Sequence, residues 1–337
     1  MSRLTGSAFS VSGLRSARSF LSALVLGAVT LMSGWAHAAY PERPISLVLS
    51  FPPAGASDIL ARAIGQKLGE VLGQTVVIEN KPGAGGYIGM AYASKATPDG
   101  YTIYLSSTTN AAIAASAYST HPAHLIKDFA VIAGVATVPH MLVVPASLPV
   151  NTVPQLISYI KASPGKYNFA SQGAGTLSHL ESEVFKNIAG LDLVHVPYKG
   201  SSQALPDLIA GTASMMFDSI PASLPHVKSG RLKVLAVASS KRVGLLPNVP
   251  TVDESGLKGF EANNYFGLAA PKNTPAPILA ALSKAVQTAL GSAELKQRMQ
   301  EQGVDLKFMP PEEFATITEQ EFRVWGKAVE AAKVKLD

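Results

Sequence analysis

Apolar positions in the first third of the chain alternate between strand and helix patterns. Residues 45–51 are apolar nearly throughout, as in a strand buried on both faces of a parallel sheet. Between 57 and 72 apolar residues recur every three or four positions, which predicts a helix that Gly73 ends. Further strands are predicted at 75–79 and 101–106, with a short helix ending at Lys95 between them. This order predicts one doubly wound α/β array.

The same rhythm restarts near Pro139 and predicts a second array. Its strands are expected at 140–144, 168–171, 193–197, 213–218 and 232–238, and its helices at 152–162, 179–189 and 202–210. A proline-rich stretch at 247–256 has the composition of a linker. After it, a strand is expected at 264–269 and helices at 275–290 and 311–332.

Two arrays in one chain predict an α/β protein with two lobes, each a doubly wound, mostly parallel sheet flanked by helices. We expect residues 39–140 and 261–337 to form lobe 1, and residues 141–260 to form lobe 2. A ligand is expected at the carboxyl ends of the strands, where the loops converge.

The first 38 residues have the pattern of a secretory signal peptide. Three arginines without an acid precede an apolar stretch from Phe20 to Met32, and Ala36-His37-Ala38 supplies a small-x-small cleavage pattern. The apolar stretch is shorter than the roughly 20 residues that span a bilayer. We therefore expect cleavage after Ala38 and a mature protein in the periplasm, with no cysteine to carry a lipid.

Charge and composition narrow the class further. Removing the three leader arginines from the formal net charge of +5 leaves +2, and the basic residues are scattered. A nucleic-acid partner is therefore not expected. The absence of cysteine rules out disulfides, thiolate catalysis and cysteine-ligated metal.

The usual motifs of catalysis and cofactor binding are missing. The glycines at 83, 85, 86 and 89 do not fit G-x-G-x-x-G, because Ile88 stands three residues after Gly85. No P-loop, G-x-S-x-G or H-E-x-x-H occurs, and His121 and His124 lie in a polar loop. We expect no catalytic residue, no cofactor and no metal.

Three strand-to-helix loops are small, rich in glycine and hydroxyl groups, and each opens a helix. Free N–H groups at a helix start carry about half a positive charge, so such loops can bind a carboxylate without a formal cation. Turn geometry alone could also account for the glycines of any one loop. The loops are Ala54-Gly55-Ala56-Ser57-Asp58, Gln172-Gly173-Ala174-Gly175-Thr176-Leu177-Ser178-His179 and Tyr198-Lys199-Gly200-Ser201-Ser202.

Individual roles follow from residue type. Gly55 and Ala56 would supply backbone donors, and Asp58 would hold its loop or a water, with ligand contact left open. Thr176 and Ser178 are expected to donate hydroxyl hydrogen bonds to a carboxylate from a loop at the surface of an open cleft.

The other candidates have mostly supporting roles. His179 would orient the second loop, and Asp218 would anchor loop amides or the hinge. Tyr198 offers a ring wall and a hydroxyl. Thr108, Thr109 and Asn110 would either hydrogen-bond a ligand oxygen or cap a helix.

Several segments, in order, resemble the tripartite tricarboxylate transporter receptors, also called the Bug family. The resemblance covers essentially the whole chain after the leader. The segments are Tyr40-Pro-Glu-Arg-Pro-Ile45, Phe51-Pro-Pro-Ala-Gly-Ala-Ser-Asp58, Val77-Ile-Glu-Asn-Lys-Pro-Gly-Ala-Gly-Gly86, Pro98-Asp-Gly-Tyr-Thr102, Asn168-Phe-Ala-Ser171, Gly173 to His179, His195-Val-Pro-Tyr-Lys-Gly200, Met216-Phe-Asp218 and Leu246-Pro-Asn-Val-Pro-Thr251.

The resemblance implies a Venus-flytrap receptor that binds small carboxylates or dicarboxylates, aromatic ones included, and delivers them to large and small integral-membrane transporter subunits. It also implies that the loops before Asp58 and His179 present helix N-termini to the ligand. Two departures matter: Ala54 stands where the family usually has glycine, and Ala115-Ser116-Ala117-Tyr118 replaces an Asn-Pro before a Leu-Tyr pair. We expect a monomer that is not an enzyme. The alternatives are a ligand-sensing receptor for a membrane signalling partner and a periplasmic enzyme acting on a small organic acid.

Overall fold

The computed structural model describes residues 1–2, 6, 40–120 and 122–336. The predicted leader and its cleavage position therefore lie outside the described residues, apart from positions 1, 2 and 6. The chain divides into two units, Met1–Glu42 and Arg43–Asp337, and every helix and strand below belongs to the second.

Strands and helices alternate through most of this unit. The strands are β1 (Ile45–Leu49), β2 (Val76–Asn80), β3 (Thr102–Ser107), β4 (Phe129–Pro145), β5 (Tyr167–Ser171), β6 (Leu193–Pro197), β7 (Met215–Ser219), β8 (Leu232–Val237), β9 (Asn263–Pro271) and β10 (Asp305–Met309). The helices are α2 (Ala56–Leu72), the 3-10 turn η1 (Ala84–Gly86), α3 (Tyr87–Ser94), α4 (Thr108–Ala117), α5 (Leu125–Asp128), α6 (Val153–Lys161), α7 (Leu177–Ala189), α8 (Ser201–Ala210), α9 (Ile220–Lys228), α10 (Ala276–Leu290), α11 (Ala293–Gln300) and α12 (Pro311–Ala331).

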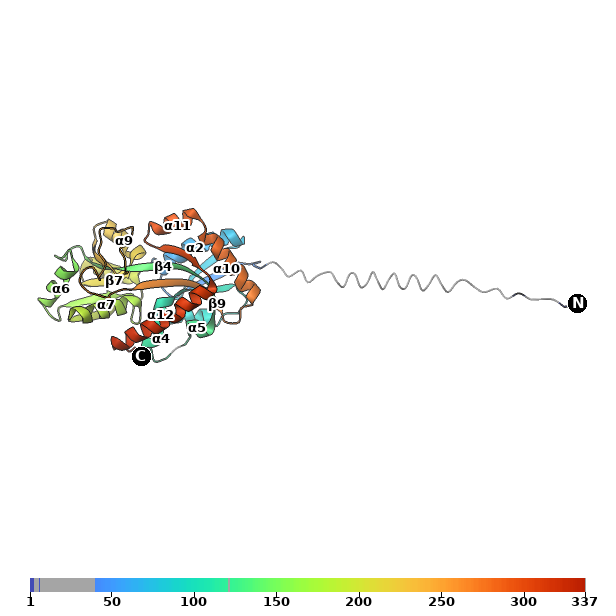
Figure 1. Cartoon of the computed structure of the whole chain (residues 1–337), viewed down its shortest axis with the longest axis horizontal. Coiled ribbons are helices and arrows are strands. Elements are labelled where there is room, and N and C mark those ends of the chain that lie inside the picture. Colours follow the sequence, from blue (N-terminus) through green and yellow to red (C-terminus); the bar gives the residue numbers. More distant parts are fainter. Residues whose placement is uncertain (3–5, 7–39, 121, 337) are drawn as a thin grey trace. The chain divides into compact units, whose positions relative to one another are not determined.

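The strands form one path in the order β2-β1-β3-β9-β4-β7-β5-β6, and β8 and β10 also pair with β4. The ends of the path are parallel: β1 pairs with β2 and β3, and β5 pairs with β6 and β7. In Figure 1 the green β4 and the orange β9 run side by side through the middle. Helices α6 and α7 lie toward one end, and α2, α5 and α10 toward the other. The predicted α/β class is confirmed.

Strand β4 links the two parallel groups. It pairs with β9 from Phe129 to Pro139, and from His140 onward it pairs with β7 and β8. Proline has no N–H for a sheet hydrogen bond, and Pro139 stands where the pairing changes. The sequence predicted only 140–144 of this strand, because Gly134 and Pro139 interrupt its apolar run.

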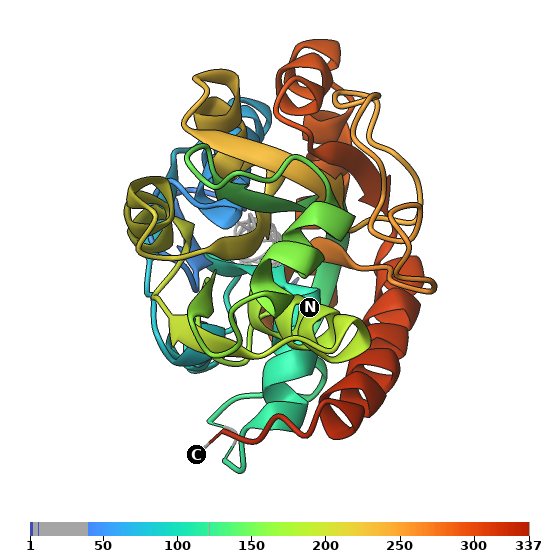
Figure 2. The ribbon, with the colours of Figure 1, turned by 90° about the vertical axis from the view of Figure 1, so that its left-hand side faces the viewer.

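Two glycines let helix α12 lie close against the crossing strands. Gly134 of β4 and Gly267 of β9 are register partners, and the Phe314 ring of α12 covers both. A Cβ atom at Gly267 would lie 2.0 Å from Cε1 of Phe314, and one at Gly134 would lie 2.3 Å from Cδ2. Any larger residue at either position would displace the ring. Helix α12 also packs along α4, as Figure 2 shows near the C-terminus.

The proline-rich stretch 247–256 is not a free linker, contrary to the prediction. Its backbone joins the end of β8: the Val237 amide donates to Pro250 at 2.9 Å, and the Val252 amide donates to Val237 at 2.9 Å. Val252 is fully buried in the same core as Phe217 and Phe260. The prolines therefore shape a packed segment.

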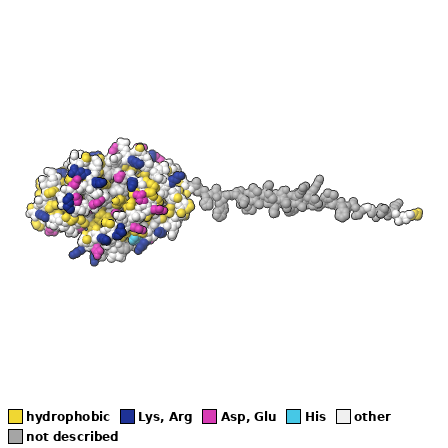
Figure 3. Space-filling model, in the orientation of Figure 1, with side chains coloured by type: hydrophobic (Ala, Val, Ile, Leu, Met, Phe, Trp, Pro, Cys, Tyr) yellow, Lys and Arg dark blue, Asp and Glu magenta, His cyan; other side chains and the backbone are white. Residues whose placement is uncertain are grey.

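In the described part of the chain, no helix combines the length and the apolar character needed to cross a membrane. Basic and acidic side chains are interspersed on the face shown in Figure 3, with apolar side chains between them.

Candidate functional site

Strand-to-helix loops from both parallel groups meet around a small cavity. The space open to a water molecule in it is about 20 Å³. Its walls come from the starts of α2, α4 and α8, the end of β5, and the crossing strands β4 and β9. The lining residues are Phe51, Pro52, Gly55, Ala56, Ser57, Asn110, His140, Gln172, Gly200, Ser201, Asn264 and Phe266. Of the predicted site residues, Gly55, Ala56, Ser57, Asn110 and Gln172 thus come together here.

The Asp58 carboxylate fixes the conformation of the first loop through hydrogen bonds. The Asp58 carboxylate accepts two hydrogen bonds from Arg62, both at 2.9 Å, one from the Ala54 amide at 3.1 Å and one from Asn80 at 3.1 Å. Burial alone would raise the pKa of Asp58, but the Arg62, Ala54 and Asn80 contacts outweigh it and lower that pKa. Asp58 is absent from the cavity wall, and its hydrogen bonds to Ala54 and Asn80 hold the first loop.

Ala54 occupies a backbone conformation that favours glycine. Its φ is 65°, in the left-handed region that costs an L-residue about 1–2 kcal/mol. The residue is exposed and does not line the cavity. The methyl group therefore strains the turn rather than narrowing the space between the loops.

In the second loop the two predicted hydroxyl donors are buried and bonded within the fold. The Thr176 hydroxyl donates to the Gly173 carbonyl at 2.7 Å and accepts from the His179 amide as the N-cap of α7. The Ser178 hydroxyl donates to the Phe217 carbonyl. Both side chains are fully buried, so the expectation of a surface loop is wrong.

The remaining residues of the second loop shape it. Gly173 and Gly175 have φ values of 137° and 74°, and neither lines the cavity. His179 orients the loop as expected, because its Nδ1 accepts a 3.3 Å hydrogen bond from the Gly175 amide. Its ring stacks on His195 with 3.9 Å between the centroids.

His195 of β6 stacks on His179 and also contacts Ser171, at the end of β5. Its Nε2 and the Ser171 hydroxyl are 2.6 Å apart. Burial, with smaller contributions from His179 and Lys186, lowers the pKa of His195 to about 3. Burial likewise lowers the pKa of His179. The stacked pair is therefore neutral at neutral pH.

Asp218 of β7 ties the second and third loops together. One carboxylate oxygen accepts from the Gln172 amide at 2.7 Å and from the Ser201 hydroxyl at 2.6 Å, and the other accepts from Ser223. Asp218 is fully buried and is absent from the cavity wall. Its anchoring geometry agrees with the role suggested by the sequence.

The Tyr198 hydroxyl is turned away from this cavity. It donates to Asp207 of α8 at 2.6 Å, and Tyr198 does not line the cavity. Burial, together with Asp207, raises the pKa of Tyr198 to about 12. The Tyr198 hydroxyl is thus bonded to the neighbouring helix α8.

Helix α4 begins at Thr108, with Ser107 as its N-cap residue, so Thr108, Thr109 and Asn110 form its first turn. Thr108 and Thr109 are fully buried, and the Thr109 hydroxyl contacts the Asn263 carbonyl and the Glu321 carboxylate. Asn110 alone of the three reaches the cavity, and its side-chain oxygen accepts a 2.7 Å hydrogen bond from the Leu177 amide.

Sequence reasoning missed several wall residues. Among them are His140, Asn264 and Phe266, which lie on the crossing strands. Gly200 and Ser201 of the third predicted loop do line the wall, and Gly200 faces Pro52 so closely that a Cβ atom would lie 2.7 Å from Pro52 Cγ. A signal was available for His140, since a histidine inside the apolar run 138–144 is a buried polar group that needs a partner.

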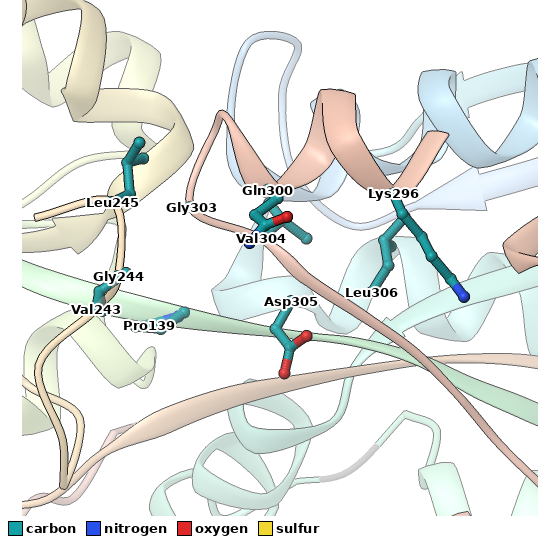
Figure 4. A pocket seen from close by; sticks show the side chains of 10 residues that line it. All are labelled: Pro139, Val243, Gly244, Leu245, Lys296, Gln300, Gly303, Val304, Asp305 and Leu306. Atoms are coloured by element: carbon teal, nitrogen blue, oxygen red, sulfur yellow. The ribbon is translucent and has the colours of Figure 1, made fainter. Parts of the chain in front are cut away.

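A larger cavity lies elsewhere and brings together none of the predicted site residues. It measures about 320 Å³. Figure 4 shows Lys296, Gln300 and Asp305, from the α11–β10 segment, across from residues 243–245. No strand-to-helix loop of the predicted site contributes to this cavity.

Residues 60–334 match the family described as tripartite tricarboxylate transporter family receptor. This chain belongs to that family. The receptor is 35% identical over 298 residues to protein BugT of Bordetella pertussis, a match that covers 88% of this chain and 91% of BugT. The resemblance found in the sequence is confirmed.

Solved structures agree with this assignment and with the two-lobed periplasmic-binding-protein fold. The periplasmic binding protein BugD is 35% identical, with a TM-score of 0.84 over 88% of this chain and 99% of that one. R. palustris Rpa4515 with adipate is 34% identical, with a TM-score of 0.85 over 87% and 98%. MatC from Rhodopseudomonas palustris with bound malate is 30% identical, with a TM-score of 0.79 over 86% and 100%.

Proposed function

We propose that this receptor binds a small carboxylate or dicarboxylate in the cavity between its loops. The observation that carries the proposal concerns the N-termini of α2 and α8. Their N-cap residues are Gly55 and Gly200, which have no side chain to cap the helix, and both N-termini line the cavity. Uncapped first-turn amides are the groups that bind an anion at a helix N-terminus. The described wall contains no lysine or arginine, so backbone amides would meet the negative charge. Relatives with adipate and malate support the same ligand class.

We also propose that residues 39–140 with 261–337 and residues 141–260 act as two lobes that close about β4 and β9. Opposite walls already touch, because Asn110 bonds to Leu177 and Gly200 meets Pro52. A space of about 20 Å³ holds little more than one water. A dicarboxylate therefore needs the lobes to separate before it binds and to close afterward.

The proposed biological role is delivery of the ligand, in the periplasm, to the large and small membrane subunits of a tripartite tricarboxylate transporter. We propose cleavage after Ala38 and action as a monomer. We also propose binding without turnover, because Asp58, His179 and Asp218 already hold loops through the contacts described above.

A thermal-shift screen followed by calorimetry tests the proposed ligand class. Malate, adipate and acetate should be compared with the neutral diamide of adipate at equal concentration. A ligand present at 100 times its Kd should stabilise the protein by about 2.7 kcal/mol. Stabilisation by no carboxylate, or equal stabilisation by the neutral diamide, would contradict the proposal. NMR of the recovered ligand would show turnover if the chain were an enzyme.

A further inference from the structure

His140, which lines the same cavity, forms a buried pair with the carboxylate of Glu181. Nδ1 of His140, on β4, is 2.7 Å from Oε2 of Glu181, on α7, and the two side chains are 0% and 1% exposed. The other polar atom of each, Nε2 of His140 and Oε1 of Glu181, has no hydrogen-bond partner within the described chain. Leaving a buried polar group unsatisfied costs about 1–3 kcal/mol, so these atoms call for an explanation.

The position of His140 suggests what Nε2 is for. His140 lines the cavity together with Asn264 and Phe266 of β9 and Asn110 of α4. It also stands at the first residue of β4 that pairs with β7, so its backbone lies where the two proposed lobes join. Since Nδ1 is turned toward Glu181, the opposite edge of the ring is the one available to an occupant of the cavity.

We propose that His140 is a ligand-contacting residue that donates its Nε2 proton to a carboxylate oxygen, and that it does so only while His140 and Glu181 together hold one acidic proton. This inference rests on the proposed function, because it assumes that a carboxylate occupies the cavity. Glu181 is then a positioning residue, which acts on the ligand through His140.

The proton chemistry of the pair gives Nε2 a definite role. With the acidic proton on His140, Nδ1–H donates to the Glu181 carboxylate and Nε2 also carries a proton. With that proton on Glu181, the carboxylic acid donates to Nδ1, and the neutral ring again carries its proton on Nε2. Nε2 is thus a donor in both forms of the net-neutral pair. Loss of the acidic proton makes Nε2 an acceptor and leaves a net negative charge that repels an anion.

The charges around the pair favour keeping the proton. The groups that act on His140 are Glu181 of α7 and Asp218 of β7, and the α2, α4, α8 and β9 residues of the cavity wall carry no ionisable side chain. Burial alone would lower the pKa of His140, but the two carboxylates outweigh it and raise that pKa. Burial raises the pKa of Glu181. Both directions favour retention of the acidic proton by the pair.

Calorimetry of the full chain with malate and with adipate, between pH 6 and pH 9, tests the proposal. Titrations in phosphate and in Tris, whose ionisation enthalpies differ, measure the protons taken up on binding. We expect affinity to fall by up to tenfold per pH unit once the pair loses its proton, and proton uptake to rise toward one in the same range.

Variants separate the contact from the fold. His140→Asn keeps a polar atom near the Nδ1 position for Glu181 but removes Nε2, so affinity at pH 6 should fall about tenfold or more and the pH dependence should disappear. Glu181→Gln should move the loss of affinity to lower pH. His226→Gln on α9 is the matched control, because the charge of Asp218 also acts on this histidine but His226 does not line the cavity. The pH dependence of ligand affinity in this variant should match that of the wild type.

The outcomes are distinguishable. Wild-type binding with no proton uptake and no pH dependence would overturn the role of His140 while leaving the proposed function intact, and this measurement needs no variant to fold. Unchanged affinity in a folded His140→Asn variant would do the same. Failure of the wild type to bind any carboxylate at any pH would overturn the proposed function and this inference together.

Discussion

The side-chain oxygen of Asn110 accepts a 2.7 Å hydrogen bond from the Leu177 amide and thereby joins α4 to the first residue of α7. Asn110 also donates to the Ser107 hydroxyl at 2.6 Å, which fixes the side chain in place. The two helices belong to different proposed lobes, so this bond links those lobes and should stabilise the proposed closed arrangement.

Removing this bond should favour the open receptor. Asn110→Ala leaves the Leu177 amide without its partner, at a cost to the closed form of about 1 kcal/mol. Small-angle scattering without ligand should then give a larger radius of gyration than for the wild type. Asn110→Asp keeps the acceptor and should stay compact, although its negative charge should weaken carboxylate binding. Equal radii for the alanine variant and the wild type would show that Asn110 does not hold the lobes.

Gly200 should be required for closure. A Cβ atom there would lie 2.7 Å from Pro52 Cγ on the opposite wall, and the φ of Gly200 is 145°. Gly200→Ala should therefore weaken ligand binding by more than about tenfold, which corresponds to about 1.4 kcal/mol. Gly211→Ala is the control, because its φ is 80° at the other end of α8 but its Cβ would lie 3.8 Å from the nearest atom, Ser147 Oγ. Calorimetry showing equal affinities for the two variants would contradict the closure argument.

The Gly267–Phe314 contact should be a large determinant of stability. Gly267→Ala places a methyl group 2.0 Å from a Phe314 ring carbon, so α12 must shift. We expect the free energy of unfolding to fall by about 1–3 kcal/mol in urea denaturation. Gly244→Ala has open space around its Cβ and should change stability by much less. Comparable losses in both variants would show that the close approach of α12 is not the cause.

Ala54→Gly should stabilise the receptor. Glycine relieves about 1–2 kcal/mol of left-handed strain and costs about 0.4–1 kcal/mol of extra freedom in the unfolded chain, so a net gain of about 0.5–1 kcal/mol is expected. Ala162 is also exposed but has an ordinary φ of −68°, so Ala162→Gly should destabilise. Thermal unfolding of the two variants checks the opposite signs, and a loss of stability in Ala54→Gly would contradict the assigned strain.

His195 should make the fold sensitive to mild acid. Its folded pKa of about 3 lies below the unfolded value of about 6.5, so the unfolded chain takes up a proton first as the pH falls. This contribution to stability is complete above pH 6.5 and is lost progressively from 6.5 down to about 3. The loss should be below about 1.4 kcal/mol per pH unit, because the ring is partly exposed. Urea denaturation from pH 7 to pH 5 should show a steeper loss in the wild type than in His195→Gln, and parallel curves would contradict this assignment.

The sequence predicted well what depends on local periodicity. Helix α2 was expected at 57–72 and spans Ala56–Leu72, and α12 was expected at 311–332 and spans Pro311–Ala331. For Asp58 the sequence suggested a holding role and left ligand contact open, and for Asp218 it suggested an anchoring role; both carboxylates hydrogen-bond to loop residues.

What the sequence could not predict depends on contacts between distant segments. Thr176 and Ser178 have the right residue type for ligand donors, but their hydroxyl protons go to the Gly173 and Phe217 carbonyls. Nothing local indicates which carbonyl lies within reach. His140 meets Glu181 41 residues further along the chain, and the cavity wall it joins exists only once β4 and β9 have paired.

Pro139 and Asn263 are register partners in the β4–β9 ladder. The chain therefore leaves the part of the sheet formed by β1, β2, β3 and β9 next to the point where it returns. The segment between them, which carries the second and third loops, is one continuous stretch of chain whose ends are adjacent. Recombination at these two neighbouring positions would exchange that segment between relatives as one module. A chimera made in this way would inherit its α2 contacts from one parent and its α7 and α8 contacts from the other, and new ligand preferences could arise in a single step.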